Sequence, residues 1–531
     1  MGRKGTADVS SDVLVIGSGV AGLSFALQMA DFAPVLIITK REKAESNTNY
    51  AQGGLAAVLS QTDSFEEHIN DTLVCGDGLC DRDVVEKVIR AAPACIEELA
   101  RMGADFNKTE NGDFDLGIEG GHSKRRIVHA DDLTGREVER VLLKAAEEHP
   151  SITILENQIA VNLVVEKNRC IGCYVLDART STIRSFVAKL TVLATGGIGR
   201  VFIHSTNPEI ATGDGIAMAY RAGATVMDME FTQFHPTTLY HPLADSFLIT
   251  ESLRGEGAIL TDKRGRRFMS DYHPMMELAP RDVVARAIDN ELKKSGEDHV
   301  LLDVSMKDPQ FVQTRFPEIY EKCLSVGIDI TEEPIPVVPA AHYCCGGVRA
   351  TLAGETDVGN LFAIGEVACT TLHGANRLAS NSIIEGLVCA RYAAERCRDL
   401  LKTGIRLQPF PAWEPGEAVD SDEMVVVTHN RDEIRRIASN YVGIVRSNKR
   451  LARAKDRIGL LKREINQYYW DFIITAGLVE LRNMAVVAEL IIDSAMMRKE
   501  TRGIHYSLDY PQKLLNARHT LLKQPNQALR T

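Results

Sequence analysis

The stretch Asp12-Val-Leu-Val-Ile-Gly-Ser-Gly-Val-Ala-Gly22 decides the fold, because it joins a short apolar strand to a glycine turn. A helix is expected from about Leu23 to Ala30, and Val35 to Thr39 has the apolar, β-branched composition of a second strand. A strand, a helix and a strand in this order form a βαβ unit with a parallel sheet and a right-handed crossover. The sequence therefore predicts an α/β fold that begins with a nucleotide-binding unit.

Gly17, Gly19 and Gly22 form a Gly-x-Gly-x-x-Gly motif between this strand and this helix. The first glycine permits the tight turn, the second lets the backbone approach a pyrophosphate, and the third lets the helix pack on the sheet. The helix N-terminus then faces the phosphates. A turn that is rich in glycine for structural reasons alone can have the same spacing, so the motif needs support from the rest of the chain.

Three strand ends together favour FAD over NAD. An NAD site would place an acid at the end of the second strand, whereas this strand is followed by Lys40, which suits a ribose or a phosphate. Leu190-Thr-Val-Leu-Ala-Thr-Gly-Gly197 is a strand that ends in small residues, which allow close backbone approach. Asn360-Leu-Phe-Ala-Ile-Gly-Glu366 is a strand that ends in an acid suited to the hydroxyls of a ribityl chain. Downstream, Ser380-Asn-Ser382 is expected to cap a helix from about Ile383, whose N-terminus would stabilise an anionic reduced flavin.

The composition is that of a folded globular protein. The chain has 531 residues, of which 45% are hydrophobic and 25% charged, and this length suggests about three to four domains. A net charge of −11 argues against a protein that tracks nucleic-acid phosphates. The 11 cysteines include one isolated Cys-x-x-Cys, Cys170 to Cys173, so we expect reduced thiols in a cytoplasmic protein and no metal site. No signal peptide is visible, and charges at Glu480, Arg482 and Glu489 interrupt the apolar segment 472–496, so no transmembrane segment is expected.

The remaining chain divides by its periodicity. Residues 152–194 alternate as several strands, and residues 404–422 look like a linker. A helical pattern follows from about 428 to 500, with a second long stretch at Val479–Met497. One apolar face of the first stretch contains Ile434, Ile437, Ala438, Tyr441, Val442 and Val445. The neighbours Cys344 and Cys345 are expected to be two thiols, because a disulfide between adjacent residues is strained.

Seven further segments carry a resemblance to a known family. They are Tyr50-Ala-Gln-Gly-Gly54, Glu119-Gly-Gly-His-Ser123, Gln233-Phe-His-Pro-Thr237, Thr250-Glu-Ser-Leu-Arg-Gly-Glu256, Ala279-Pro-Arg-Asp-Val283, His342-Tyr-Cys-Cys-Gly-Gly347 and His373-Gly-Ala-Asn-Arg377. With them the chain resembles the succinate dehydrogenase/fumarate reductase flavoproteins over nearly its whole length. Within that family it is most similar to the branch that oxidises L-aspartate.

The resemblance implies a Rossmann-type FAD-binding domain that is split in sequence, an inserted α+β capping domain and a C-terminal helical domain. The expected boundaries are 1–228 and 344–413 for the two parts of the FAD domain, 229–343 for the capping domain and 414–531 for the helical domain. The membrane-bound members attach FAD through a histidine whose position corresponds to Asn47, so noncovalent FAD is expected here. With the glycine motif, the expected FAD contacts are Gly17, Ser18, Gly19, Val20, Ala21, Gly22, Lys40, Asn47, Thr48, Asn49, Tyr50, Ala51, Gln52, Gly53, Gly54, Ala160, Val161, Asp214, Glu366, Ser382 and Ile383.

The resemblance also implies a site for a dicarboxylate. Two buried carboxylates need cationic or hydrogen-bonding partners at both ends. The family's carboxylate-binding positions correspond to Gln233, His235, Thr250, His342 and Arg377. Its catalytic arginine corresponds to Arg281, and its proton pathway to Glu251 and Arg254. Because arginine is a poor base, Arg281 suits proton donation to fumarate, or the positioning and polarisation of an amino-acid substrate.

Glu119 is predicted to decide the substrate. L-Aspartate has the frame of succinate plus an ammonium group, and a carboxylate near that group would favour aspartate over succinate. The succinate-type members lack an acid here. The alternative is that Glu119 is a solvated acid in a glycine-rich loop. Cys344 departs from the threonine that is usual in the aspartate-oxidising branch and from the asparagine of the succinate enzymes, and it is expected to contact the flavin or substrate edge indirectly.

The resemblance implies oxidation of L-aspartate to iminoaspartate, the first step of NAD biosynthesis, with oxygen or fumarate as electron acceptor. It also implies a transient handover of the product to quinolinate synthase. One alternative is a soluble fumarate reductase or succinate dehydrogenase flavoprotein subunit. Another is a flavin-binding assembly subunit without activity.

Overall fold

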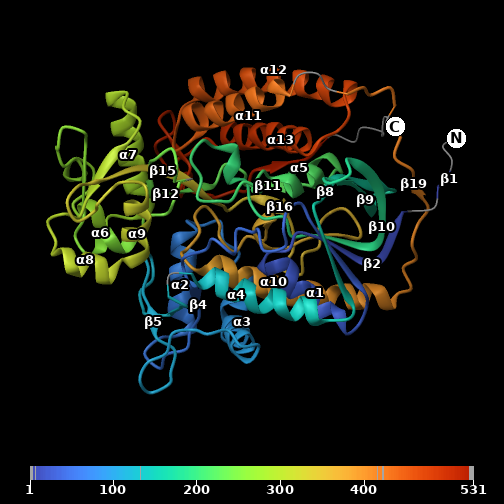
Figure 1. The fold of residues 1–531 in the computed structure, drawn as a ribbon, viewed down its shortest axis with the longest axis horizontal. Helices are drawn as coiled ribbons and strands as arrows, with labels where there is room; N and C mark the ends of the chain where they lie inside the picture. The colour runs from blue at the N-terminus through green and yellow to red at the C-terminus, as the bar shows by residue number, and fades with distance from the viewer. Residues whose placement is uncertain are drawn as a thin grey trace.

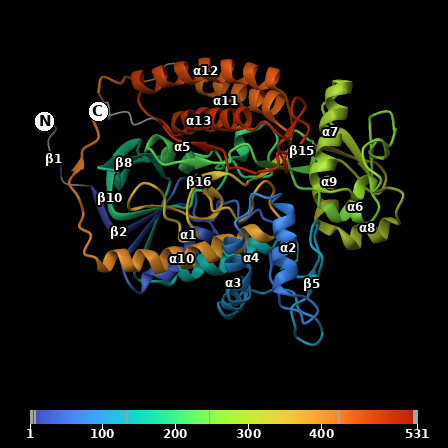
Figure 2. The ribbon, with the colours of Figure 1, turned by 180° about the vertical axis from the view of Figure 1, so that it is seen from behind.

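The computed structural model describes residues 4–5, 8–131, 133–244, 246–414, 416–420 and 424–524. Figure 1 shows a central sheet between two helical layers, with a separate lobe at one end and both chain ends at the other. The layer that α10, α1 and α4 form lies below the sheet in this view, and the layer that α11, α12 and α13 form lies above it. The view from behind in Figure 2 shows the same arrangement.

The central sheet has seven strands in the order β7-β3-β2-β10-β9-β8, with β17 also paired to β10. The pairs among β7, β3, β2, β10 and β17 are parallel, and β8 and β9 form an antiparallel extension. The strands are β2 (Val9–Ile16), β3 (Val35–Thr39), β7 (Ile152–Glu156), β8 (Gln158–Glu166), β9 (Arg169–Asp177), β10 (Thr182–Leu193) and β17 (Leu361–Ala363). The predicted strands are therefore confirmed, as is the α/β fold class.

The first helix begins earlier than the sequence suggested. Helix α1 spans Val20–Ala30, so its first turn lies inside the glycine motif. It packs against α10 (Asn381–Lys402), in which Gly386 lies next to Val20 and Ala21 at the start of α1. Leu23, Phe25 and Val388 are fully buried in the core of this layer. The layer also contains α2 (Phe65–Cys75), α3 (Arg82–Arg101) and α4 (Thr134–Glu148), next to a small sheet of β4 (Leu55–Ala56), β5 (Leu116–Gly117) and β6 (Ile127–Val128).

The separate lobe has its own antiparallel sheet in the order β12-β15-β14-β13. Its core includes Leu260, Phe268 and Ile288, which are fully buried. The strands are β12 (Thr232–Leu239), β13 (Ile259–Thr261), β14 (Val300–Asp303) and β15 (Ile335–Cys344). The helices are α6 (Glu251–Gly255), α7 (Arg281–Ser295), α8 (Pro309–Arg315) and α9 (Pro317–Ser325). Below, this lobe is called the capping lobe.

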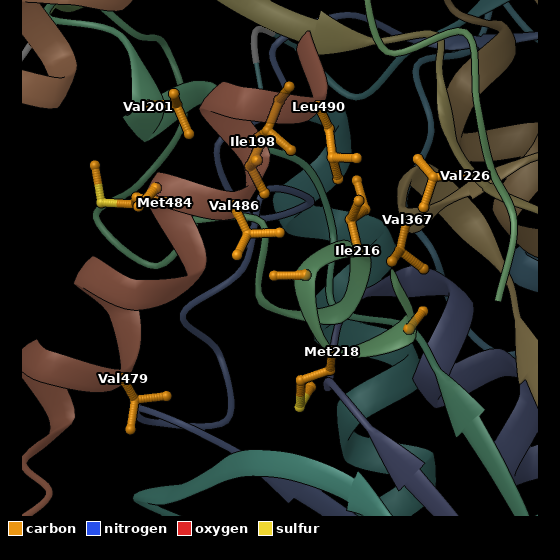
Figure 3. Packing of buried hydrophobic residues seen from close by; sticks show 14 of the residues in the cluster. Ile198, Val201, Ile216, Met218, Val226, Val367, Val479, Met484, Val486 and Leu490 are labelled. Carbon is orange, nitrogen blue, oxygen red and sulfur yellow. The ribbon is translucent and has the colours of Figure 1, made fainter. Parts of the chain in front are cut away.

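Three long helices cover the other face of the molecule. They are α11 (Val425–Ile437), α12 (Asn448–Asp471) and α13 (Ala476–Met497). Figure 3 shows apolar side chains of α13, such as Val486 and Leu490, near Ile216 of α5 (Asp214–Arg221). They share one core cluster, so the helical layer and the central sheet form one packed unit. A further sheet has the order β18-β16-β11-β22 and consists of β11 (Val226–Met227), β16 (Gly347–Arg349), β18 (Ala368–Cys369) and β22 (Leu521–Leu522).

One predicted feature of the helical region is wrong in detail. The apolar face that begins at Ile434 does not continue to Val445 in one helix, because α11 ends at Ile437 and a π-helical turn follows at Ala438–Val442. Gly443 favours this end, since glycine is a poor helix former. Val445 instead belongs to β20 (Val445–Arg446), which pairs with β21 (Tyr506–Ser507).

The expected linker 404–422 contains one short strand, β19 (Phe410–Pro411), which pairs with β1 (Lys4–Gly5). Residues 415, 421 and 422 of this segment lie outside the described residues. Among the helices that the structure describes, none is both long enough and apolar enough to span a membrane.

Candidate active site

A cavity of about 710 Å³ lies where the strands β2 and β10 end and the capping lobe begins. All of the predicted FAD contacts line it except Gly22 and Val161. All of the predicted catalytic residues line it except Gln233 and Arg254. Segments from both halves of the chain therefore meet around one cavity.

The glycine motif fits a pyrophosphate. Gly17 has a φ of 116°, and a Cβ added there would lie 2.2 Å from the carbonyl oxygen of Ala194. A Cβ at Gly22 would lie 2.1 Å from Gly17 O, so only glycine fits at this position, which is packed against the turn and does not line the cavity. At Gly19 the nearest atom would be 3.4 Å away, at Thr48. The backbone therefore carries no side chain at Gly17 and Gly19, where a phosphate would approach the N-terminus of α1.

Glu366 and Asn47 form a polar pair in the cavity wall. Asn47 Nδ2 donates to Glu366 Oε2 at 2.9 Å, and the backbone N–H of Cys344 donates to Oε1 at 3.1 Å. Burial raises the pKa of Glu366 to about 7. Asn47 Oδ1 is buried and has no hydrogen-bond partner among the described residues. An unpaired acceptor beside a carboxyl suits the hydroxyls of a ribityl chain, so the residues present fit a flavin.

Lys40 lies in the cavity wall, but it is already paired. Its Nζ lies 2.7 Å from Asp214 Oδ2, 3.0 Å from Glu480 Oε1 of α13 and 2.8 Å from Thr212 Oγ1. Burial alone would lower the pKa of Lys40, but the two carboxylates outweigh it and raise the pKa. The sequence predicted Lys40 and Asp214 as FAD contacts but missed Glu480, because nothing in its helical pattern marks it.

Arg377 is placed to bind a carboxylate. Its guanidinium donates to Gln233 Oε1 and to Ser382 Oγ, both at 3.1 Å, and lies 4.7 Å from the centre of the Tyr343 ring. Its Nε is buried without a partner among the described residues. Gln233 does not line the cavity itself but accepts from Arg377 behind the wall. The geometry therefore keeps one cationic group aligned and available.

Two histidines stand near this arginine. The rings of His235 and His342 have centroids 5.8 Å apart, and Thr206 Oγ1 lies 2.8 Å from His342 Nδ1. Burial, together with the nearby arginine charges, holds the pKa of both histidines well below the usual value. Both are therefore neutral hydrogen-bonding groups at physiological pH. Thr206 was not predicted, because its segment has no motif.

Arg281 is the first of three charged side chains that contact one another in sequence, and all three belong to the capping lobe. Its Nε donates to Glu251 Oε2, and Glu251 Oε1 lies 3.6 Å from Arg254 Nη2. Burial alone would lower the pKa of Arg281, but the Glu251 and Glu119 carboxylates outweigh it and raise the pKa. Although burial opposes it, the two arginines hold the pKa of Glu251 below the usual value. Thr250 is the N-cap of α6, which carries Glu251 and Arg254.

Glu119 faces the cavity from the glycine-rich loop between β5 and β6. Ser380 Oγ donates to Glu119 Oε2 at 2.6 Å and accepts from the backbone N–H of Gly54 at 3.1 Å. Ser380 therefore occupies the N-cap position of α10, as predicted, but its side chain does not make the expected capping hydrogen bond. Its φ of 60° is left-handed, the helix begins at Asn381, and its hydroxyl makes no cap bond because it is used by Glu119 and Gly54.

Cys344 and Cys345 are both buried free thiols. Cys344 does not line the cavity, and its contact with the cofactor region passes through its backbone N–H and Glu366. Within the described ranges, no three histidine, cysteine or acidic side chains gather in a way that would hold a metal ion.

Comparisons with known proteins agree with this geometry. Residues 12–383 match a family model described as an FAD binding domain, and residues 431–528 match one described as a fumarate reductase flavoprotein C-terminal region. An L-aspartate oxidase 1 of Ralstonia nicotianae is 51% identical, covering 96% of this chain and 98% of that protein. An L-aspartate oxidase of Pseudomonas aeruginosa is 50% identical, covering 97% and 98%. Among solved structures, a point variant of an E. coli quinol fumarate reductase is 31% identical with a TM-score of 0.85, covering 96% of this chain and 94% of that chain.

Proposed function

The chain belongs to the L-aspartate oxidase family of FAD-binding flavoproteins, and from this premise we propose that it oxidises L-aspartate to iminoaspartate. FAD is its cofactor. The chemistry that FAD supplies when bound is acceptance of the α-hydrogen as hydride, from a substrate whose ammonium group has first lost a proton to solvent, with reoxidation by oxygen, giving hydrogen peroxide, or by fumarate, giving succinate. Asn47 carries an amide where the membrane-bound flavoproteins have their linking histidine, which supports noncovalent binding.

A single negative side chain beside a cationic pocket carries the proposal for the substrate. Arg377 and Arg281 are the cations, with the neutral His235 and His342 near them, and Glu119 faces the same cavity. A four-carbon diacid would satisfy the cations at both ends, and an α-ammonium group would pair with Glu119. Succinate would leave that carboxylate without a partner, which disfavours it.

Each polar group has a defined part in the proposed reaction. Arg377 binds one carboxylate, with Gln233 and Ser382 keeping its guanidinium aligned. Arg281 keeps its proton, so it polarises and positions the substrate during oxidation. When fumarate is reduced to succinate, Arg281 is the proton donor, and it regains its proton through Glu251 and Arg254. The capping lobe supplies these three residues, so closure of this lobe would complete the site and exclude water.

Reduction of fumarate is the second activity that we propose for the same cavity. The structural similarity of this protein to a quinol fumarate reductase chain of 31% sequence identity supports this activity. The contacts that join Arg281, Glu251 and Arg254 support it as well. In this proposal fumarate is an acceptor and not the main substrate.

Anaerobic reduction of the bound flavin tests the proposal. Purified protein with FAD is mixed with L-aspartate or with succinate, and the absorbance of the oxidised flavin is followed. We expect complete bleaching by L-aspartate and at most slow, partial bleaching by succinate. Faster bleaching by succinate would instead assign a succinate dehydrogenase activity, and no bleaching by either would assign a subunit without this activity.

The cellular compartment, the enzyme that receives the product and the domain boundaries complete the proposal. The eleven cysteines are free thiols, which supports a reducing compartment such as the cytoplasm. Because iminoaspartate hydrolyses readily, a handover to quinolinate synthase is part of the proposal. The division at residues 228, 343 and 413 is also kept as a proposal, supported by the separate core of the capping lobe.

A further inference from the structure

The loop that carries Arg377 is held between two distant parts of the chain. The backbone N–H of Ala375 donates to Gly76 O at 2.9 Å, in the turn that follows α2. On the other side, the N–H of Ile504 donates to Ala375 O at 3.1 Å. The segment from Arg498 to Leu514, which follows α13, therefore contacts the loop directly.

These contacts are closer than side chains would allow. A Cβ added at Gly503 would lie 2.3 Å from Ala375 O and 2.5 Å from Ala375 Cβ. A Cβ added at Gly374 would lie 2.5 Å from Gly76 O. Interiors packed this closely transmit a displacement to the next segment instead of absorbing it. The place of Gly503 therefore sets the place of Ala375, two residues before Arg377.

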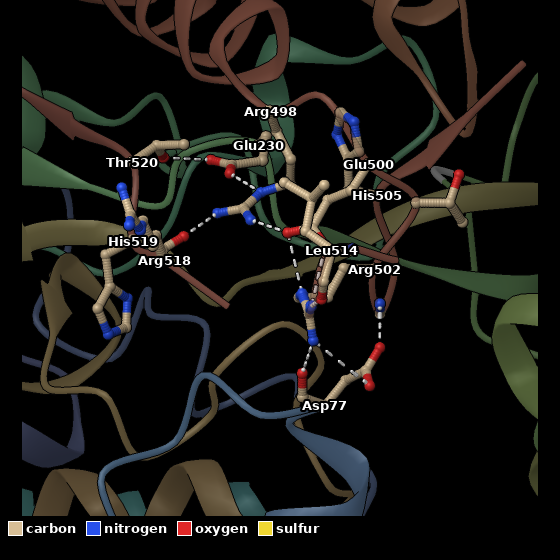
Figure 4. Close-up of polar contacts among 12 residues, drawn as sticks. Asp77, Glu230, Arg498, Glu500, Arg502, His505, Leu514, Arg518, His519 and Thr520 are labelled. Carbon is tan, nitrogen blue, oxygen red and sulfur yellow. Dashed lines mark hydrogen bonds and ion pairs between the residues drawn. The ribbon is translucent and has the colours of Figure 1, made fainter. Parts of the chain in front are cut away.

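A cluster of charged side chains, of which Glu500 and Arg502 are buried and Asp77 is half-buried, fixes Gly503 in turn. Figure 4 shows Arg502 between Glu500 and Asp77. Arg502 Nη1 donates to Asp77 O at 2.6 Å, and its Nε donates to Glu500 Oε1 at 3.0 Å. The N–H of Gly503 donates to Asp77 Oδ2 at 2.8 Å. Asp77 directly follows Gly76, so the same turn holds the loop from one side and the C-terminal segment from the other.

The cluster also reaches the strand that carries the other carboxylate-binding residues. Arg498 Nε donates to Glu230 Oε1 at 2.5 Å, and Arg498 Nη1 donates to Glu500 Oε1 at 2.7 Å. Glu230 lies just before β12, which holds Gln233 and His235. Buried charges are tolerated only when their partners are in place, so this cluster has one well-defined arrangement.

We propose that Asp77, Arg502 and Gly503 are positioning residues for the Arg377 carboxylate clamp, so that the C-terminal segment sets the affinity for the dicarboxylate. The inference rests on the proposed function, in which Arg377 binds a substrate carboxylate. None of the three lines the cavity as the described residues define it. Their effect passes through the backbone of Ala375. A misplacement of about 1 Å in a substrate clamp can cost on the order of 100-fold in rate.

A pair of glycine variants tests the inference. Gly503→Ala adds a Cβ against Ala375, whereas Gly404→Ala adds one at a position with a φ of 80° and no neighbour within 4 Å. Both variants strain a left-handed backbone, so only the contact differs. We measure kcat and KM for L-aspartate, the affinity for FAD by flavin fluorescence, and the binding of fumarate to the oxidised protein from changes in flavin absorbance.

For Gly503→Ala we expect KM for L-aspartate and the dissociation constant for fumarate to rise together, by about 10-fold or more. The affinity for FAD should stay within about twofold, and Gly404→Ala should resemble the wild type. Unchanged ligand binding in a folded Gly503→Ala protein would overturn the inference. A parallel loss of FAD affinity would also overturn it, since that would show a general structural role.

A second set of variants serves if Gly503→Ala does not fold. Asp77→Ala removes the acceptor for Gly503 N–H, whereas Asp77→Asn keeps an oxygen there and tolerates the φ of 52° at this position. We expect Asp77→Ala to weaken fumarate binding several-fold and Asp77→Asn to restore most of it. Lys513→Ala, which removes only the exposed ion pair with Asp77, should change nothing. Equal binding by Asp77→Ala and the wild type would contradict the inference.

The fumarate measurement keeps the two proposals apart. A wild-type protein that binds fumarate but does not oxidise L-aspartate would reject the proposed function. The same protein would still show whether Gly503 and Asp77 control the carboxylate clamp.

Discussion

Ser380 Oγ lies 2.6 Å from Glu119 Oε2 and donates to it the one proton that its hydroxyl carries. The direction of this bond is fixed, because the same oxygen accepts the N–H of Gly54 at 3.1 Å. Glu119 Oε1 makes no hydrogen bond within the described part of the chain, so it stays available to a substrate. One hydroxyl therefore joins the loop that ends at Gly54, the start of α10 and the carboxylate that we propose to bind the ammonium group of the substrate.

Glu119→Gln should separate the two activities. The amide keeps the shape of the side chain and an oxygen for Ser380, but it loses the charge that attracts an ammonium group. We expect kcat/KM for L-aspartate to fall at least about 30-fold, equivalent to about 2 kcal/mol. Fumarate has no amine, so its reduction by the reduced flavoprotein should stay within about threefold. Steady-state kinetics with both substrates measure this. An equal loss of both activities would mean that Glu119 does not bind the ammonium group of L-aspartate.

Ser380→Ala should have a weaker effect of the same kind. It removes the donor to Glu119 and leaves the Gly54 N–H without its partner, and a lost hydrogen bond of this type costs about 1–2 kcal/mol. We expect kcat/KM for L-aspartate to fall about 10-fold. The double variant with Glu119→Gln should be little worse than Glu119→Gln alone, because both changes act on one interaction. Additive losses in this double-mutant cycle would show that Ser380 acts elsewhere.

Sequence patterns predicted the parts of the site that are local and missed those that are distant. The glycine motif, the strand that ends at Leu193 and the acid at Glu366 could be recognised, because short segments fix their conformation. Ser380 is the N-cap residue as predicted, but the use of its hydroxyl was misjudged, since a serine at this position usually bonds to the first turn of the helix and only the tertiary contact with Glu119 shows otherwise. The partnership of Lys40 with Glu480 joins residues 440 positions apart, and no periodicity encodes it.

Gly197→Ala should weaken FAD binding. A Cβ at Gly197 would lie 2.1 Å from Glu366 Oε1, so it would displace the carboxyl that Asn47 and Cys344 hold in the cavity wall. We expect the dissociation constant for FAD, measured by flavin fluorescence, to rise at least about 10-fold. Gly459→Ala is the matched control, because the nearest atom to its Cβ would be the end of Arg463 at 3.8 Å and Gly459 does not line the cavity. FAD affinity that is equal in the two variants would refute the assignment of Glu366 to the cofactor.

The affinity for fumarate should show no histidine ionisation near neutral pH. His235 and His342 have pKa values well below the usual value, because burial and the nearby arginines disfavour their charged forms. Both therefore stay neutral from about pH 6 to about pH 8, and KM for fumarate should vary less than about twofold over that range. Fumarate is the better probe, since its own carboxyls do not titrate there. A KM that falls with decreasing pH around about 6.5, and that no longer does so in His235→Gln or His342→Gln but still does in Glu366→Gln, would show that at least one of these histidines binds as a cation.

Glu139 gives a prediction for stability, because it is a buried acid that bonds to Ser46, at the start of the loop over residues 46–54. Its side chain is 2% exposed, Ser46 Oγ donates to its Oε2 at 2.5 Å, and its Oε1 has no partner among the described residues. Burial raises the pKa of this carboxyl to about 8. The folded protein therefore keeps a proton here that the unfolded chain releases above its ordinary pKa of about 4.5.

Glu139→Gln should remove part of the pH dependence of stability. Between the unfolded pKa of about 4.5 and the folded pKa of about 8, the folded state binds more protons than the unfolded state, so stability falls as pH rises through this window. The neutral amide does not titrate, and it should match the wild type at about pH 5 but exceed its free energy of unfolding at about pH 8 by roughly 2–4 kcal/mol. Denaturant unfolding of the FAD-free protein at both pH values measures this. Glu148→Gln, at the exposed end of the same helix, controls for the loss of a charge and should show no such gain. If Glu139→Gln were instead less stable than the wild type at the higher pH, the carboxyl would have to be ionised and stabilising in the folded protein.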